Sequence, residues 1–529
     1  MLSPQSNRRR HRSRIIVLRP ICPSLSYCSA TMDDAAGPRR FSVSSALVPK
    51  LIDDGPGRKL SHATVFSETE PLLAHGIVED TTTIGHESKL LFKYSLPLTL
   101  TYLLQYSFSL VTVFVVGHIG TDELGAVSLA TMTASITGYA VYEGLTTSLD
   151  TLCAQAYGSG RKELVGLHLQ RMTCLLFLVT VPVGVVWICS GWLLAHLVPE
   201  QDLAYLAGGY LRILLAGTPG YFLFEAGKRF TQAQGLFGAS LVVLLICTPI
   251  NVLLNYVFVF VLRLGLSGAA LAVVVSNTLL PICLFLYVRF IVPSSLECWG
   301  GFTKQAFRNW GPMVKLALPG IIMVEAEWLA FDILTFSSSY ISTADLAAQS
   351  VVMTICVVMF HIPFSVSVAV STRLGNLIGS GALSAAKLAT KTYAIIFVVM
   401  GLIDGTIMAT ARTKLPQAFS SDPEVVRLAA AVMPVLAAFQ LFDATTALVN
   451  GLLRGLGRQS VGGYANLFVY YIIAVPLALF LCFGPPKLDL AGLWTGCVVG
   501  SALITVSEGS YIIFFDWSKA VEDARSRSD

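Results

Sequence analysis

Three carboxylates stand close together in an apolar stretch of this sequence. Glu325, Glu327 and Asp332 fall within Met323–Asp332. At about 100° per residue on a helix, Glu327 and Asp332 are roughly 140° apart, and Glu325 lies on another side from Glu327. A charge inside a bilayer costs roughly 2.5–3.5 kcal/mol even on the lenient insertion scale. These acids suit chemistry in which a proton, Na⁺ or a cationic solute neutralises them; the alternative is a structural pair hydrogen-bonded to neighbouring helices.

Single acids interrupt two further apolar stretches. Asp443 stands in an otherwise apolar run, so we expect a functional role for it. Glu225 has Lys228 and Arg229 one turn away, and these could neutralise it. We therefore expect Glu225 to be structural.

Asp404 and Glu508 are expected near the membrane interfaces and receive no role. The lone His361 is expected to be buried and structural.

Aromatic and amide side chains near the acids could complete a site for an organic cation, through cation–π contact and shape. The candidates are Trp328, Phe331, Asn466, Tyr470 and Tyr471. Packing or an interfacial belt explains the two tyrosines nearly as well.

The elements that must position these residues are membrane-spanning helices. Apolar residues make up 54% of the 529 residues and charged residues only 13%, which excludes an ordinary soluble domain. From about residue 90 onward, apolar segments of roughly 20 residues recur, which is the length of a helix that crosses a bilayer. We place twelve, centred near residues 104, 136, 179, 214, 250, 280, 325, 358, 397, 436, 473 and 503. The fold class predicted is therefore all-α and integral to a membrane.

The distribution of Lys and Arg predicts the orientation. Basic residues follow the even-numbered segments, as in Arg161 and Lys162, Arg289, and Arg454 and Arg458. The positive-inside rule then places both termini in the cytosol. The loop after the ninth segment, with Arg412 and Lys414, disagrees.

The chain repeats itself after a little more than 220 residues. Leu96–Pro97 has a counterpart in Leu318–Pro319, and Gly158-Ser159-Gly160 in Gly379-Ser380-Gly381. Two parallel six-helix bundles on either side of a central cleft are a recurrent plan of secondary transporters. We predict a disordered cytosolic tail (1–88), a first lobe (89–300), a second lobe (301–518) and a short cytosolic tail (519–529).

The N-terminal tail carries two sequences that bear on location. Residues 1–31 contain six arginines and no acid, which resembles a mitochondrial transit peptide; the alternative, which we favour, is an upstream start with Met32 opening the protein. Glu68–Leu73 resembles an acidic dileucine sorting signal. The sequence is therefore compatible with a location in the vacuolar membrane or in the plasma membrane.

Several classes of function find no support in the sequence. The basic residues do not form the clustered face that nucleic acid requires, and the scattered cysteines indicate neither a disulfide framework nor a metal site. We expect no cofactor beyond a coupling H⁺ or Na⁺, and a monomer whose partners are a small organic solute and the lipid bilayer. A lipid-linked precursor flippase would need a cationic cleft. An intramembrane transferase would need Asp-rich motifs or a buried His with a nucleophile.

Three motifs resemble those of eukaryotic multidrug and toxic compound extrusion (MATE) transporters. They are Leu149–Gly158 with Asp150 and Gln155, Ser371–Asn376 with Arg373 and Asn376, and Leu453–Gln459 with Arg454 and Gln459. Their order and spacing agree from about residue 90 to 515, and Gly220–Phe230 looks closest to the fungal branch. The resemblance implies twelve helices in two lobes that export organic solutes in exchange for H⁺ or Na⁺, and we expect these solutes to be cationic.

The resemblance also implies roles for particular acids. Glu327 and Asp332 match the two acids of the family's seventh helix, and Asp443 matches the acid of its tenth. Asp stands at 332 and 443 where Glu is commoner. Thr354 replaces an acid of some animal members, and Gln105 is the polar residue where prokaryotic members carry an acid in the first helix. These departures favour protons over Na⁺ as the coupling ion.

Overall fold

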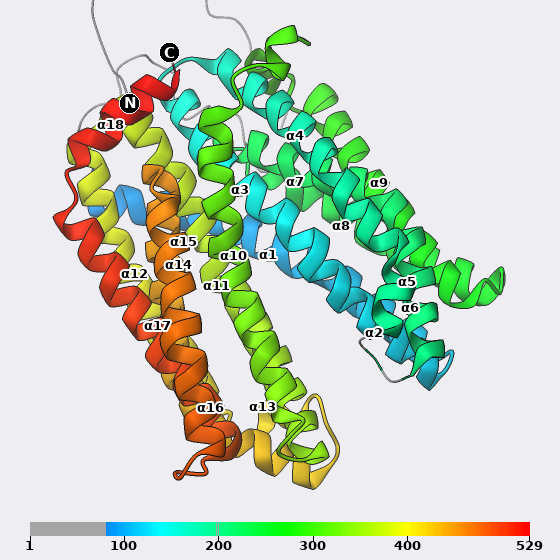
Figure 1. Cartoon of the computed structure of the whole chain (residues 1–529). Coiled ribbons are helices and arrows are strands. Elements are labelled where there is room, and N and C mark those ends of the chain that lie inside the picture. The colour runs from blue at the N-terminus through cyan, green and yellow to red at the C-terminus, as the bar shows by residue number, and fades with distance from the viewer. Residues whose placement is uncertain (1–80, 197, 199, 529) are drawn as a thin grey trace, which may run out of the picture. The chain divides into compact units, whose positions relative to one another are not determined.

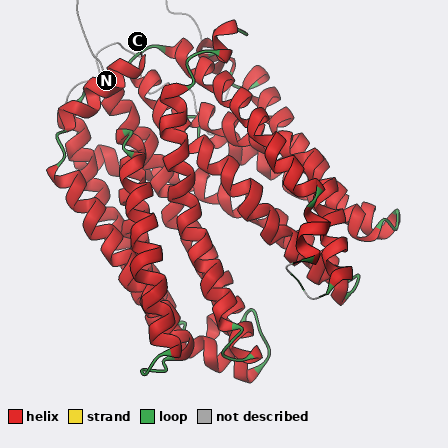
Figure 2. Ribbon diagram, viewed as in Figure 1, coloured by secondary structure: helices red, strands yellow, loops and turns green. Residues whose placement is uncertain are grey.

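The computed structural model describes residues 81–196, 198 and 200–528, and within these residues it contains helices and no β-strand (Figure 2). Segment 1–31, Met32 and Glu68–Leu73 lie outside the described residues, so the interpretations that rest on them stay predictions.

The first half of the chain forms six helical segments of membrane length (Figure 1). In chain order they are α1 (Ile84–Gly117); α2, η1 and α3 (Thr121–Ala134, Ser135–Tyr139, Ala140–Gly158); α4 (Lys162–Ile188); α6, η2 and α7 (Gln201–Leu214, Leu215–Gly217, Thr218–Ala233); α8 and η3 (Gly238–Tyr256, Val257–Val261); and α9 (Gly265–Phe290). A short helix, α5 (Ser190–Ala195), follows α4, and two 3₁₀ turns, η4 (Pro293–Cys298) and η5 (Lys304–Phe307), lead into the second half.

The second half forms six more segments. They are α10 (Gly311–Ser338); α11 (Thr343–Ser380); α12 (Leu383–Thr410); α14 (Pro423–Leu456); α15, η6 and α16 (Gln459–Phe468, Val469–Ala474, Val475–Phe483); and α17 (Asp489–Phe514). Two short helices, α13 (Lys414–Gln417) and α18 (Trp517–Ser528), complete the described chain.

The all-helical membrane class predicted from the sequence is confirmed, and each of the twelve predicted centres falls within one of these segments. Ten of the segments are long and apolar enough by themselves to cross a bilayer. Of the other two, α6–α7 is divided by the 3₁₀ turn η2 into two shorter helices, and α10 contains several charged residues. Three of the charged residues of α10, namely Glu325, Glu327 and Asp332, are the acids that the sequence marks as candidates for chemistry.

The internal repeat is visible in the helices. The α2–α3 segment and α11 are each 38 residues long and start 222 positions apart. Each is followed by a glycine in the left-handed region, Gly160 at φ 80° and Gly381 at φ 79°. Such a backbone favours glycine because it has no Cβ, and it lets the chain turn at once into the next helix. We call the end of the bundle where α3 and α11 finish the motif end, and the opposite end the far end.

The predicted N-terminal tail extends too far. Thr83 caps α1, whose first turn already contains the buried Glu87. Its carboxylate accepts hydrogen bonds from Arg373 on α11, at 2.7 and 3.2 Å, and from Tyr393 on α12, at 2.7 Å. These charge-assisted bonds to distant helices order residues that look like a tail in the sequence.

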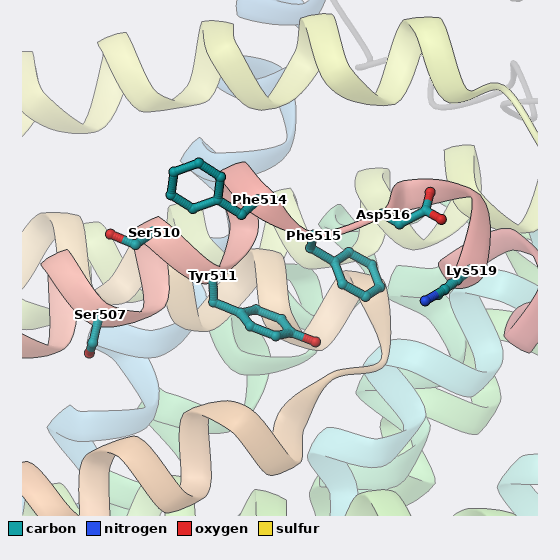
Figure 3. Close-up of a pocket in the computed structure, with 7 residues that line it drawn as sticks. All are labelled: Ser507, Ser510, Tyr511, Phe514, Phe515, Asp516 and Lys519. Carbon is teal, nitrogen blue, oxygen red and sulfur yellow. The ribbon is translucent and has the colours of Figure 1, made fainter.

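The predicted C-terminal tail is helical. Trp517, Val521 and Ala524 of α18 are buried against the motif end. Arg527 donates to the side chain of Gln155 at 2.8 Å. A shallow hollow lies where α17 meets α18, lined by Ser507, Ser510, Tyr511, Phe514, Phe515, Asp516 and Lys519 (Figure 3). It contains none of the predicted site residues.

Candidate functional site

Glu327 and Asp443 interact electrostatically between helices of the second half, where Asp443 is buried and Glu327 is half-buried. Glu327, on α10, accepts a hydrogen bond from Tyr470 on η6 at 3.3 Å. Asp443, on α14, is 2% exposed, and its Oδ2 atom has no hydrogen-bond partner among the protein groups. The charges of Glu327 and Asp404 both act on Asp443. The helices of the second half therefore enclose a group of carboxylates.

These carboxylates have no basic partner within hydrogen-bond reach. Among the described residues, neither Glu327 nor Asp443 forms a salt bridge; the basic residue whose charge acts on Glu327 is Arg454. A buried charge is costly unless it is paired, so this arrangement requires a bound cation or proton.

Glu325 and Asp332 lie on a different face of α10 and interact with each other electrostatically. Seven residues on a helix fall only about 20° short of two full turns, which places the two side chains on one face. Both are half-buried, and Trp328 on the same side of the helix is exposed. Acids on an exposed face would be very unfavourable against lipid, so this face suits a pathway that water can enter.

A row of rings leads from this face to the first half. Trp328 lies edge-to-face with Phe360 of α11, with ring centres 6.4 Å apart. Phe360 lies beside His361, whose ring is 5.3 Å from that of Tyr106 on α1. His361 was predicted to be buried, but it is half-buried. Its Nδ1 atom forms a hydrogen bond with the carbonyl oxygen of Val357.

Several residues that were predicted to line a substrate cavity make contacts within the protein instead. Phe331 packs against Phe439 and Trp494 in the core of the second half. Asn466 is fully buried and donates to the carbonyl of Met323 at 3.2 Å. Tyr471 is half-buried and donates to the carbonyl of Ala326 at 3.3 Å. Of the residues predicted to line a cavity, Trp328 presents the most open surface.

Gln105 belongs to an ion-pair network in the first half. It donates to Glu225 at 2.8 Å and accepts from Lys228 at 3.1 Å, so both ends of its amide are engaged. Glu225 also pairs with Lys228 at 2.8 Å and with Arg229 at 3.2 Å, which confirms its neutralisation by these bases. Arg229 continues to Asp150 at 3.3 Å. Glu225 and Asp150 are therefore both paired. Glu143 of α3, which is half-buried and interacts electrostatically with Glu225 and Arg229, forms no salt bridge within the described part of the chain.

The motif residues meet one another between the halves at the motif end. Asp150 on α3 approaches Arg454 on α14 at 3.9 Å. Gln155 donates to the carbonyl of Gly455 at 3.0 Å, and Gln459 donates to the carbonyl of Thr147 at 3.0 Å. Asn376 on α11 donates to the carbonyl of Ala233 on α7 at 3.5 Å. These contacts join segments that lie 143 to 312 residues apart in the sequence. Polar contacts of this kind can be exchanged for water when the halves separate.

Gly158→Ala tests the closeness of this contact. A Cβ at Gly158 would meet the backbone carbonyl of Asn376, which cannot move aside as a side chain can. We expect a destabilisation of about 1–3 kcal/mol, typical of overpacking, and a lower melting temperature in detergent micelles. Gly209→Ala on α6, where nothing lies within 4 Å, is the control and should not lower it. Equal melting temperatures for both variants would show that the halves are not in close contact here.

The sequence did not reveal several residues that the structure brings to these sites. Tyr106 and Phe360 extend the row of rings, and Asp404 and Glu508 are buried although they were expected near the interfaces. Glu87 was placed in a tail. A charged residue within an apolar helix was the available signal for Asp404 and Glu508, but helices that are apolar all round do not show which face is buried.

Twelve helical segments with unpaired carboxylates enclosed between them define a multi-pass membrane protein of the kind that moves ions and solutes across bilayers. The sequence profile of the MatE family matches residues 97–257 and 319–480, one match in each half. The chain belongs to this family, the MATE transporters, which are not enzymes. The resemblance seen in the sequence motifs is thereby confirmed.

Known relatives agree with this assignment. The chain is 42% identical over 457 residues to "Uncharacterized transporter YDR338C" of Saccharomyces cerevisiae, covering 86% of this chain and 64% of that protein. It is 33% identical over 445 residues to "Multidrug and toxin extrusion protein 2" of Mus musculus, covering 84% and 77%. The crystal structure of the eukaryotic MATE transporter AtDTX14 superposes with a TM-score of 0.80 at 31% identity, covering 84% of this chain and 100% of that one. The Vibrio cholerae transporter VcmN, at 16% identity and a TM-score of 0.72, over 85% and 100% of the two chains, shares the fold.

Proposed function

We propose that this protein is a proton-coupled antiporter that exports organic cations from the cytosol. The observation that carries the proposal is a pair of neighbouring acids without a basic partner. Glu225 and Asp150 of the first half are paired with basic residues, and Glu143, half-buried beside that network, lies within the electrostatic reach of Lys228 and Arg229. Among the described residues, Glu327 and Asp443 of the second half form no salt bridge and interact with each other. Two neighbouring carboxylates in a low-dielectric interior are tolerated when a proton or cation neutralises them, and this requirement couples ion binding to conformation.

A proton suits this site better than Na⁺. A metal cation needs several oxygen ligands around one point, whereas a proton needs a single carboxylate. Within the described residues, the carboxylates do not gather into a group of three around a common centre. Glu327 and Asp443 would then bind the proton, and proton binding would alternate with binding of the solute.

The exposed face of α10 supports an organic cation as the solute. Glu325 and Asp332 supply negative charge there, and Trp328 begins the row of rings that reaches Tyr106. Aromatic faces attract organic cations, by about 0.5–2 kcal/mol for each contact. We propose that the cation binds along this row and leaves when protonation of the second half changes its packing.

Alternating access would open and close the contact at the motif end. The polar contacts of Asp150, Gln155 and Gln459 can be lost and regained without unfolding either half. Lys162, Arg289 and other basic residues near this end favour its placement in the cytosol. We further propose two lobes, which divide near residue 300, with the first beginning at α1 and not at residue 89, and a monomeric protein. We also propose a vacuolar or plasma membrane location; imaging of a fluorescently tagged chain would distinguish the two membranes.

The test is transport by the purified full chain in proteoliposomes. Vesicles that are acidic inside should accumulate the fluorescent cation ethidium from an alkaline medium, because proton efflux drives its entry. Vesicles with an equal Na⁺ gradient and no pH difference should not accumulate it. Uptake driven by Na⁺ alone, or uptake of the anion fluorescein in place of ethidium, would contradict the proposal.

A further inference from the structure

Four acids form a row through the second half. They are Asp404 on α12, Asp443 on α14, Glu327 on α10 and Glu508 on α17. Neighbouring members interact electrostatically: Asp404 with Asp443, Asp443 with Glu327, and Glu327 with Glu508. Asp404, Asp443 and Glu508 are 4%, 2% and 0% exposed. Glu327 thus lies in the interior of the row, with one or more acids on either side.

The row runs along the bundle from the far end toward the motif end. Gly405, next to Asp404, lies against Ala437 of α14, and Gly509, next to Glu508, lies against Val449. Twelve residues of α14 separate these two levels, which corresponds to about 18 Å along the helix. Asp443 lies between these levels on α14, and Glu327 interacts electrostatically with both Asp443 and Glu508.

Polar atoms along the row have no protein partner. Both carboxylate oxygens of Glu508, both amide atoms of the buried Gln440 and the Oδ2 atoms of Asp404 and Asp443 are of this kind. Gln440 is neutral and lies one turn before Asp443, so charge repulsion does not explain its unsatisfied state. Buried polar groups almost always have partners, and water supplies them where the protein does not. The row is therefore suited to hold water between its acids.

Few other ionisable groups face the row. Tyr470 donates to Glu327, and the thiols of Cys356 and Cys497 are within electrostatic reach. The cation that acts on Glu327 is Arg454, which approaches Asp150 of the first half. Toward the motif end, Ser507, the residue before Glu508 in the chain, lines the hollow where α17 meets α18, together with Asp516 and Lys519 (Figure 3).

We propose that Asp404, Asp443, Glu327 and Glu508 form a relay that carries the coupling proton from the far end to the motif end of the second half. The inference rests on the proposed function and adds Asp404 as the residue that takes up the proton and Glu508 as the residue that releases it. At each step one carboxylic acid gives its proton to the next carboxylate, directly or through a water molecule. After release from Glu508 the row has its starting charge again.

Asp404→Asn and Glu508→Gln test the relay in proteoliposomes of the full chain. Each variant should lower ethidium accumulation driven by a pH gradient about tenfold, within the range of measured coupling energies between sites. Exchange of external for internal ethidium at equal pH needs no proton movement and should be unchanged, which also shows that the variants fold. Glu508→Asp, which keeps the carboxylate, should retain part of the gradient-driven uptake.

Asp345→Asn is the matched control. Asp345 is a buried acid of the same half, but its carboxylate is bonded to Ser342 at the start of α11, outside the row. This variant should behave as wild type in both assays. Wild-type behaviour of Asp404→Asn and Glu508→Gln overturns the relay while leaving the antiporter intact, and loss of exchange together with uptake makes these acids structural. A wild-type chain that exchanges ethidium without responding to a pH gradient overturns the proposed function and the relay together.

Discussion

Proteoliposomes that contain Asp443→Asn should accumulate ethidium about 5- to 150-fold less than wild type under the same pH gradient, the range that a lost coupling of about 1–3 kcal/mol produces. Asparagine has nearly the same shape and can keep a hydrogen bond, but it cannot gain or lose a proton. Asp443 is buried and interacts with Glu327, so removal of its carboxylate leaves one acid where the proposed coupling uses two. Proton binding is then coupled more weakly to the conformation of the second half.

A second substitution at the same position distinguishes loss of the carboxylate from a change in side-chain volume. Asp443→Glu keeps the titratable group and should retain most of the gradient-driven uptake, because related transporters commonly carry Glu at the position that Asp443 resembles. Wild-type accumulation by Asp443→Asn would make this acid structural and would leave coupling to Glu327 and Asp332. Full activity of Asp443→Asn alongside an inactive Asp443→Glu would show that packing decides the phenotype.

Arg229→Ala should lower the free energy of unfolding by about 3–5 kcal/mol, the usual cost of removing one partner from a buried ion pair. Arg229 is 2% exposed and lies between Asp150 at 3.3 Å and Glu225 at 3.2 Å. Without its guanidinium, two acids of the first half share the charge of Lys228 and of the more distant Arg454. Chemical denaturation in detergent micelles measures the effect.

Two comparisons define the origin of that loss. Arg427→Ala removes an exposed arginine, whose nearest carboxylate is that of Glu424 at 4.0 Å, and should change stability by less than about 1 kcal/mol. The double variant Arg229→Ala, Glu225→Gln should recover part of the stability lost by Arg229→Ala, because it removes one of the stranded charges. If the stability changes of Arg229→Ala and Glu225→Gln, measured singly, add up to the change in the double variant, a direct interaction between these side chains is excluded.

The sequence alone determined the class of the protein, and it indicated Glu327 and Asp443 as candidate site residues. Apolar segments of about 20 residues must be helices in lipid, because each backbone polar group has to be bonded within its own segment. The repeat followed from matched dipeptides and glycines. Glu327 and Asp443 could be identified because a charge within an apolar segment is costly wherever it points. None of these arguments needs knowledge of which helices are neighbours.

Only the tertiary structure decided which charges have partners. In the sequence, Gln105 was a candidate only because it is the polar residue of the first helix, whereas in the structure Glu225 and Lys228, more than 100 residues away, engage both ends of its amide. Glu87 looked like part of a tail until Arg373 and Tyr393 were found beside it. The physical reason is that a membrane helix is apolar on every side, so its hydrophobic pattern does not distinguish the lipid from another helix. Whether a charge is neutralised or left to bind a proton depends on contacts across the bundle.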